Sequence, residues 1–151
     1  MKYWREHQNL RIPGPVPCPI EVIDAQTRPL IDHRGQDFGH MLKNLVERLK
    51  RIFLTDNDVF ILTSSGTGAL EASLVNTLSP GDKILAVVTG FFGQRYSDMA
   101  KALLIDVEEL HFEWGRDIDI GILREALATH PDIKAVLVTH NETSTGVTND
   151  L

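Results

Sequence analysis

The sequence has 151 residues, of which 42% are hydrophobic and 24% charged, with a formal net charge of −6 and a pI near 5.4. This is enough apolar material for one folded domain, and an acidic chain without a basic cluster argues against nucleic acid or a membrane surface as a partner. The single cysteine, Cys18, excludes an internal disulfide, and the absence of long apolar runs or a signal-like N-terminus makes the cytoplasm the expected location.

The first 35 residues are rich in proline and show no periodicity. Pro15, Pro17 and Pro19 prevent a helix in their own segment and favour an extended chain. This segment could pack over another surface, such as a second subunit, or it could cover a substrate near Gly14. We therefore expect an N-terminal arm over residues 1–35 and a separate domain over residues 36–151.

Hydrophobic periodicity divides the rest of the chain into alternating helices and strands. The expected helices cover residues 36–53, 66–78, 94–104 and 119–129. The expected strands cover residues 59–63, 84–88, 107–112 and 135–139. This alternation predicts an α/β fold, with a mostly parallel sheet covered by helices on both faces.

The last residues follow a polar loop. Asn149 and Asp150 resemble the cap and first turn of another helix. A new helix is therefore expected where the sequence stops, and we interpret the chain as a truncated part of a larger domain.

The first candidate site is the loop of small residues between the first predicted strand and its helix. Ser65, Gly66 and Thr67 would present backbone N–H groups and hydroxyls at a helix N-terminus, which suits a phosphate group. The same residues could simply cap the helix. A Walker loop is excluded because no lysine lies nearby, and Glu71 stands where a dinucleotide fingerprint needs its third glycine.

The second candidate site follows the strand predicted at 84–88. Phe91 and Phe92 lie there between two glycines, in a segment predicted to be a loop. One of these rings could stack on a planar ligand, or both could pack beneath the loop.

The third candidate site is the segment 139–146, which is polar at nearly every position. A surface loop can be polar for solubility alone, but ligands collect at the carboxyl ends of parallel strands. His140 and Glu142 do not have a convincing metal-ligand spacing, so we expect no metal site.

These segments resemble those of class V aminotransferases that use pyridoxal 5'-phosphate, and most closely the alanine–glyoxylate and serine–pyruvate group. The resemblance is carried by Ile-Pro-Gly-Pro at 12–15, Asp-His-Arg at 32–34, Ser-Gly-Thr-Gly-Ala-Leu-Glu-Ala at 65–72, Gly-Gln-Arg at 93–95 and His-Asn-Glu-Thr-Ser-Thr-Gly-Val at 140–147. Five segments in the family's order span nearly the whole chain. The resemblance implies the large domain of a fold-type I pyridoxal-phosphate enzyme, in truncated form.

The resemblance also implies roles for individual residues in binding pyridoxal 5'-phosphate. Ser65, Gly66 and Thr67 match the family loop that holds the cofactor phosphate. Phe92 stands where the family usually has an aromatic ring, often tryptophan, stacked on the pyridine. Thr143 matches a hydroxyl residue near the phenolic oxygen of the cofactor.

Substrates and assembly are implied in the same way. Gly14 belongs to an arm that lies near the substrate carboxylate in this family. The implied reaction moves an amino group from a small amino acid, such as alanine or serine, to a 2-oxo acid, such as glyoxylate or pyruvate. The family normally works as a homodimer with its sites at the subunit interface.

The chain departs from the family in its catalytic groups. The chemistry needs a lysine for the internal Schiff base and a carboxylate beside the pyridine nitrogen, and in this family both come after the matched region. The six lysines lie in the arm, within helices or at the start of strands: Lys2, Lys43, Lys50, Lys83, Lys101 and Lys134. We therefore expect this chain to contain no catalytic residue and to be inactive by itself.

Two other interpretations stay open. The chain could be part of a cysteine desulfurase or lyase that shares the fold and the cofactor. Alternatively, it could be a non-catalytic module for phosphate binding or dimerisation.

Overall fold

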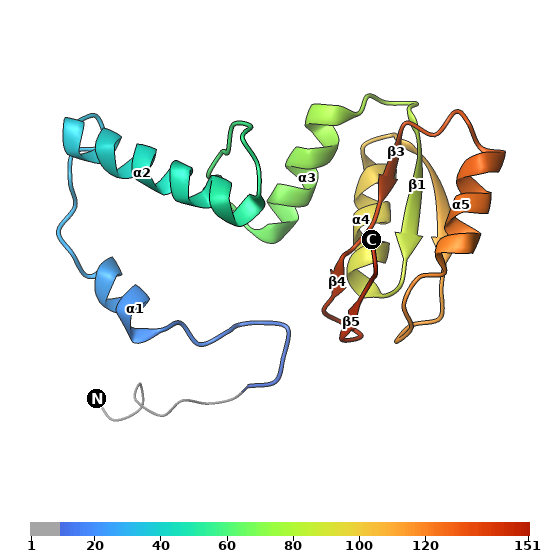
Figure 1. Ribbon diagram of the computed structural model, residues 1–151, viewed down its shortest axis with the longest axis horizontal. Helices are drawn as coiled ribbons and strands as arrows, with labels where there is room; N and C mark the ends of the chain where they lie inside the picture. The colour runs from blue at the N-terminus through green and yellow to red at the C-terminus, as the bar shows by residue number, and fades with distance from the viewer. Residues whose placement is uncertain (1–9) are drawn as a thin grey trace. The chain divides into compact units, whose positions relative to one another are not determined.

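The computed structural model describes residues 10–151 and divides the chain into two compact units, residues 1–63 and 64–151. Figure 1 shows the helices and strands of each unit. The predicted boundary after residue 35 falls within the first unit, and the first nine residues of the predicted arm lie outside the described residues.

The first unit contains two helices, α1 (Ile20–Gln26) and α2 (Gln36–Phe53). The predicted helix over 36–53 is confirmed. Asp37 in the first turn of α2, and Lys50 and Arg51 in its last turn, complement the helix dipole. The helix ends where Leu54 adopts a left-handed conformation, with φ of 50°.

The segment 15–19 contains no helix, as its prolines predict, and α1, which the sequence pattern does not indicate, begins directly after Pro19. One prediction for this unit is wrong. The segment 59–63 is not a strand, and its Phe60 side chain is 81% exposed. An apolar run becomes a strand only when a neighbour pairs with its backbone groups, and no described strand pairs with this one.

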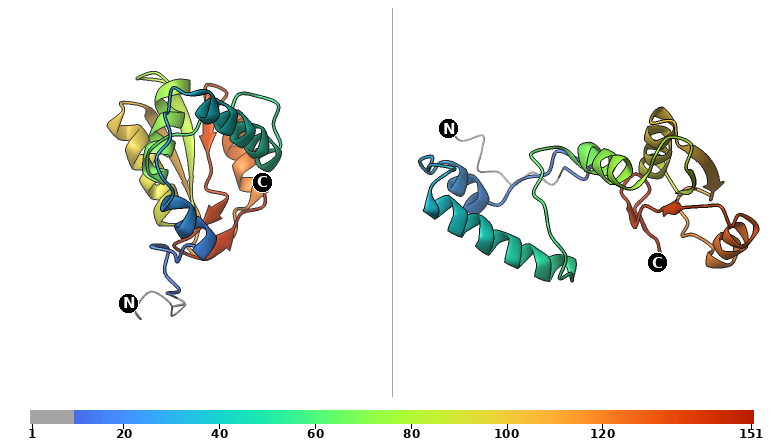
Figure 2. Two further views of the ribbon diagram at one scale, coloured as in Figure 1. Left: turned by 90° about the vertical axis from the view of Figure 1, so that its left-hand side faces the viewer. Right: turned by 90° about the horizontal axis from the view of Figure 1, so that it is seen from above.

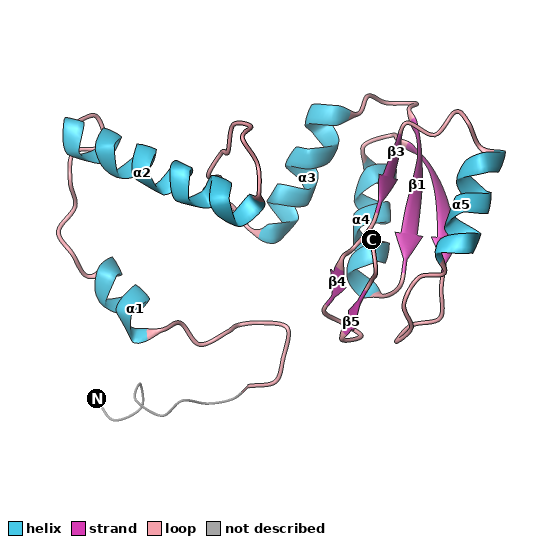
Figure 3. Cartoon of the chain, in the orientation of Figure 1, coloured by secondary structure: helices cyan, strands magenta, loops and turns pink. Residues whose placement is uncertain are grey.

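The second unit begins with helix α3 and continues as alternating strands and helices (Figure 3). Its elements are α3 (Gly66–Thr77), β1 (Lys83–Val88), α4 (Phe91–Ala102), β2 (Asp106–His111), α5 (Ile120–Thr129), β3 (Ala135–Leu137), β4 (Asn141–Glu142) and β5 (Val147–Thr148). The three longer strands form a parallel sheet in the order β2-β1-β3, which confirms the predicted α/β fold.

Helices cover both faces of this sheet. Helix α4 carries the chain from β1 to β2 on one side, and α5 returns it past β1 to β3. Because parallel crossovers are right-handed, two crossovers in opposite directions place their helices on opposite faces. Figure 2 shows α4 and α5 on opposite sides of the strands when the molecule is seen from above.

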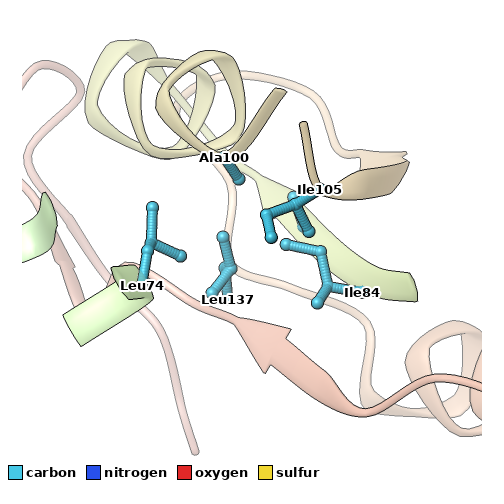
Figure 4. Close-up of a cluster of buried hydrophobic side chains, with 6 residues drawn as sticks. Leu74, Ile84, Ala100, Ile105 and Leu137 are labelled. Atoms are coloured by element: carbon cyan, nitrogen blue, oxygen red, sulfur yellow. The ribbon is translucent and has the colours of Figure 1, made fainter. Parts of the chain in front are cut away.

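The central strand β1 is buried on both faces, as its continuous apolar run predicts. Ile84 and Ala86 point to the side of α4, where they pack with Leu74, Ala100 and Leu137 (Figure 4). The intervening Leu85 and Val87 are also buried and point to the other face. No helix among residues 10–151 is long and apolar enough to cross a membrane.

Asp119 caps α5 as predicted. Its Oδ1 accepts hydrogen bonds from the N–H groups of Gly121 and Ile122, at 2.7 and 3.2 Å. We expect Asp119→Ala to lower the free energy of unfolding by about 1 kcal/mol, measured by urea denaturation. Glu113→Ala is the control, because the Glu113–Arg116 ion pair is exposed and its removal should cost close to nothing. Equal effects of the two variants would contradict the capping role.

Strand β2 carries a carboxylate that binds helix α4. Glu109 Oε1 accepts hydrogen bonds from Gln94 Nε2, Ser97 Oγ and Lys101 Nζ at 2.8, 2.5 and 2.7 Å, and Oε2 lies 3.2 Å from His111 Nε2. The bond from Lys101, followed by those from Ser97 and Gln94, lowers the pKa of Glu109 to about 2, although burial opposes the shift.

This lowered pKa predicts a specific pH dependence. The folded-state pKa lies below the unfolded value, so the ionised Glu109 stabilises the fold above about pH 4.5, and this contribution is lost as the pH falls towards 2. Glu109→Gln should therefore destabilise the chain at pH 6 by an amount that shrinks as the pH falls to 3. Urea denaturation at several pH values measures this, and a difference that does not depend on pH would contradict it.

Candidate functional site

A pocket of about 580 Å³ lies in the second unit, beyond the carboxyl ends of β1 and β3. Its walls come from α3, from α4 and from the chain that follows β3. The lining residues are Gly66, Thr67, Leu70, Phe92, Arg95, Tyr96, Val138, Thr139, His140, Asn141 and Thr143. The structure therefore brings together residues from all three of the segments singled out in the sequence.

The first wall is the N-terminus of α3. Ser65 is its N-cap residue, and Ser65 Oγ accepts a hydrogen bond of 3.3 Å from the N–H of Gly68. Gly66 and Thr67 line the pocket, and the first turn contains no acidic residue. A Cβ atom added at Gly66 would meet no atom within 4 Å. The positive end of the helix dipole and open space beside Gly66 therefore coincide at this wall of the pocket.

The second wall is the first turn of α4, which begins at Phe91. The prediction of a loop up to residue 93 is wrong, and both phenylalanines belong to the helix. Phe92 lines the pocket, whereas Phe91 does not and is 51% exposed. The two rings meet edge to face, with centroids 5.5 Å apart. Of the alternatives left open by the sequence, the structure offers Phe92 as the ring available to a ligand.

The third wall belongs to a short β-hairpin formed by β4 and β5. The polar segment after β3 forms a turn over residues 143–146, and the flanking Asn141 pairs with Thr148 and Glu142 with Val147, a pairing that the sequence pattern does not indicate. Gly146 closes the hairpin with a left-handed φ of 72°, which glycine adopts without strain. Thr143, directly after β4, lines the pocket.

The α4 helix is capped by the hairpin. Its N-cap residue is Gly90, which has no side chain to accept a hydrogen bond. Instead, Glu142 Oε1 accepts from the N–H of Phe92 at 3.3 Å and Oε2 from that of Gly93 at 3.0 Å. Ser144 Oγ accepts from the N–H of Phe91 at 3.0 Å. Three N–H groups of the first turn thus have partners about fifty residues further along the chain.

Glu142 is fully buried, and yet the groups around it favour its charged form. Burial raises its pKa, but hydrogen bonds from Ser144 and from the backbone of Gly93 and Phe92 outweigh this, so the net pKa lies below its ordinary value. The Ser144 hydroxyl donates to Oε1 at 2.6 Å, and its backbone N–H lies 3.1 Å from the same atom. All the groups that bind this carboxylate are donors, which favours the charged form.

Asn149, which directly follows β5, holds the open end of the hairpin, opposite its turn. Its Nδ2 donates to the carbonyl of Thr139 at 2.6 Å and to Thr89 Oγ1 at 3.3 Å, and its Oδ1 accepts from the N–H of Ile118. This buried side chain points inward to the ends of β1 and β3. Its hydrogen bonds hold together the chain before β4, the chain after β5 and the residue that follows β1.

Tyr96 connects the two helices of the pocket. Ser73 Oγ donates its proton to the carbonyl of Leu70 at 2.6 Å, so the 2.5 Å contact with Tyr96 requires the tyrosine hydroxyl to be the donor. Helices α3 and α4 are thereby joined beside the pocket.

This hydrogen bond predicts the effect of Tyr96→Phe. We expect the variant to lower the free energy of unfolding by about 1 kcal/mol. A double-mutant cycle with Ser73→Ala, measured by urea denaturation, isolates the pair. Additive effects of the two substitutions would contradict the bond.

Not every predicted site residue lies at this pocket. Ser65 acts on α3 as its cap and is not among the lining residues. Gly14 belongs to the first unit, whereas all the lining residues of the pocket belong to the second. Lys83 begins β1 and Lys134 precedes β3, at the opposite ends of the strands, and no lysine of the described part of the chain lines the pocket.

The family of the chain follows from comparison with known proteins. The family described as Aminotransferase class-V matches residues 23–151, which is most of the chain. The chain belongs to the class V aminotransferase family. The predicted resemblance and fold type are therefore confirmed, and dependence on pyridoxal 5'-phosphate is a general property that this family implies.

Individual relatives agree with this assignment. An aminotransferase of Methanocaldococcus jannaschii is 43% identical over 94% of the chain, and a serine–glyoxylate aminotransferase of Arabidopsis thaliana is 38% identical over 99% of it. The crystal structure of an alanine–glyoxylate aminotransferase from Nostoc sp. matches 93% of the chain with a TM-score of 0.87 and 32% identity. The chain spans 37%, 38% and 37% of these proteins, respectively.

Proposed function

We propose that this chain forms the phosphate and ring-binding side of the site of a pyridoxal 5'-phosphate-dependent aminotransferase. The proposed reaction transfers an amino group from a small amino acid, such as alanine or serine, to a 2-oxo acid, such as glyoxylate or pyruvate. Family membership and the names of the serine–glyoxylate and alanine–glyoxylate relatives support it. The observation that carries the proposal is the convergence of Gly66, Phe92 and Thr143 on one pocket.

The residues of the pocket fit such a cofactor. The open space beside Gly66, at a helix N-terminus without an acidic residue, suits a dianionic phosphate. Phe92 offers an aromatic face for the pyridine ring, and Thr143 offers a hydroxyl for its phenolic oxygen. When bound, the cofactor supplies a pyridine ring that withdraws electrons from the substrate carbon.

Each residue has a definite task in this proposal. The N–H groups of Gly66 and Thr67 bind the phosphate, while Ser65 keeps the first turn of α3 in place through its bond to Gly68. Phe92 fixes the plane of the ring and Thr143 its rotation within that plane. Gly14 near the substrate carboxylate, a homodimeric assembly, a cytoplasmic location and inactivity of this chain alone stay predictions.

Calorimetry with three ligands tests the proposal. Pyridoxamine 5'-phosphate is the main probe, because unlike the aldehyde it does not react with surface lysines. We expect it to bind at least about tenfold more tightly than pyridoxamine or inorganic phosphate, since only the whole molecule contacts all three walls. Equal weak binding of pyridoxamine 5'-phosphate and inorganic phosphate would instead support a non-catalytic phosphate-binding module. Activity assays of the whole protein with alanine, serine and cysteine as amino-group donors separate the aminotransferase from a desulfurase or lyase.

A further inference from the structure

We propose that Glu142 is a positioning residue that fixes the ring-binding wall of the pocket against its hydroxyl-bearing wall. The inference rests on the proposed function for the identity of the ligand. Its evidence is separate, because Glu142 does not line the pocket and acts through the residues that do.

The carboxylate joins two walls that come from distant parts of the chain. On one side it binds the backbone of Phe92 and Gly93, and on the other it binds the backbone and hydroxyl of Ser144. Glu142 itself immediately precedes Thr143. Displacement of the carboxylate would therefore move the Phe92 ring relative to the Thr143 hydroxyl.

The site is built for this side chain. Glu142 has 0% exposure, and a Cβ atom added at Gly90 would lie 2.5 Å from its Cγ and 2.7 Å from its Cδ. Glycine at position 90 thus leaves just enough room for the glutamate to reach the first turn of α4. No buried polar side-chain atom of residues 10–151 lacks a hydrogen-bond partner, so the carboxylate is fully satisfied.

The arrangement also assigns different tasks to the two helix ends at the pocket. Glu142 and Ser144 already satisfy the first turn of α4, and the buried negative charge complements its dipole. The first turn of α3 has only its own Ser65 cap, without a charged partner. A ligand phosphate is therefore directed to α3, while α4 is left to hold the aromatic ring.

Glu142→Gln tests the proposal at almost unchanged size. Every group around the carboxylate is a donor, so the new amide N–H₂ must face one of them, and one bond to the α4 backbone is replaced by repulsion. We expect affinity for pyridoxamine 5'-phosphate to fall about tenfold and affinity for inorganic phosphate to change less than about twofold. Amide hydrogen exchange at Phe92 and Gly93 should accelerate at least about tenfold in the absence of ligand.

Glu109→Gln is the matched control. It makes the same acid-to-amide change at a carboxylate that also binds α4 but lies outside the pocket. We expect this variant to lose stability while it keeps the wild-type ratio of the two affinities. Ser144→Ala is the second test variant, because it removes one donor to Glu142 and the partner of the Phe91 N–H. We expect an affinity loss for pyridoxamine 5'-phosphate of about threefold.

The outcomes distinguish this inference from the proposed function. If Glu142→Gln keeps wild-type affinity for pyridoxamine 5'-phosphate, or loses affinity for both ligands equally, Glu142 does not position the ring. Unchanged amide exchange at Phe92 and Gly93 would overturn the inference even if the wild-type chain bound neither ligand. If the wild-type chain does not prefer pyridoxamine 5'-phosphate but amide exchange at Phe92 and Gly93 is faster in Glu142→Gln, the proposed function is overturned, whereas the role of Glu142 in holding the first turn of α4 is supported.

Discussion

Gly90→Ala is expected to lower the free energy of unfolding by about 3 kcal/mol. The new methyl group would lie 2.5 to 2.7 Å from Glu142 and 2.7 Å from Ser144 Oγ. Glu142 cannot move aside without breaking its bonds to the α4 backbone, so steric strain is added to the loss of charge-assisted hydrogen bonds. The backbone at Gly90 is extended, with φ of 173°, and alanine can adopt it. The cost is therefore one of space, and urea denaturation measures it.

Gly66→Ala is the control for this experiment. It makes the same chemical change at a position where the added Cβ meets nothing within 4 Å, so its effect should stay within about 0.5 kcal/mol. A Gly90→Ala variant as stable as Gly66→Ala would show that the Glu142 side chain is not held as described.

Gly66→Val should have the opposite profile, a large effect on ligand binding and a small one on stability. The valine side chain would occupy the open space at the N-terminus of α3 and block approach of a phosphate to the N–H groups of Gly66 and Thr67. Loss of two charge-assisted hydrogen bonds corresponds to an affinity for pyridoxamine 5'-phosphate that is lower by roughly one hundredfold. Calorimetry measures the affinity, and thermal unfolding without ligand confirms that the fold is kept.

The contrast with Thr67→Ser sharpens this prediction. Serine keeps both the hydroxyl and the backbone N–H at position 67, so its affinity should remain within about threefold of the wild-type value. Wild-type affinity in Gly66→Val would mean that the phosphate does not bind at α3.

The sequence predicts those elements whose determinants are local. The apolar spacing over 36–53 gives α2, the continuous apolar run beside Ile84 gives β1, and Asp119 caps α5. The strand predicted at 59–63 fails because strand formation depends on a neighbour, which no run of apolar residues reveals by itself.

The start of α4 is missed for a similar reason. Its cap comes from Glu142 and Ser144, about fifty positions away, and the local pattern at Gly90 shows only turn residues. This error also hides part of the pocket. Once α4 begins at Phe91, helical spacing places Phe92, Arg95 and Tyr96 on one face, but a helix expected to start at 94 does not group them.

The sequence predicts those residues of the candidate site whose place at the pocket follows from their position in the fold. Phe92 and Thr143 line the pocket because the segments after β1 and β3 converge at the carboxyl ends of these strands, and Gly66 reaches the same pocket at the N-terminus of α3, although no strand precedes it. The structural role of Glu142 is not predictable, because an acidic residue in a polar segment gives no sign that it is buried. A functional interpretation of that segment from its polarity alone therefore overlooks the residue that holds it together.

The most direct test of the central claim is where pyridoxamine 5'-phosphate binds on this chain. NMR of the isotope-labelled chain should show chemical-shift changes of the Gly66 and Thr67 amides on addition of the ligand, and intermolecular NOEs between the ligand's ring methyl group and the Phe92 ring. Inorganic phosphate should shift the same two amides without affecting Phe92. Contacts of the ligand ring with residues outside the pocket, or unchanged Gly66 and Thr67 amides at saturation, would contradict the proposed site.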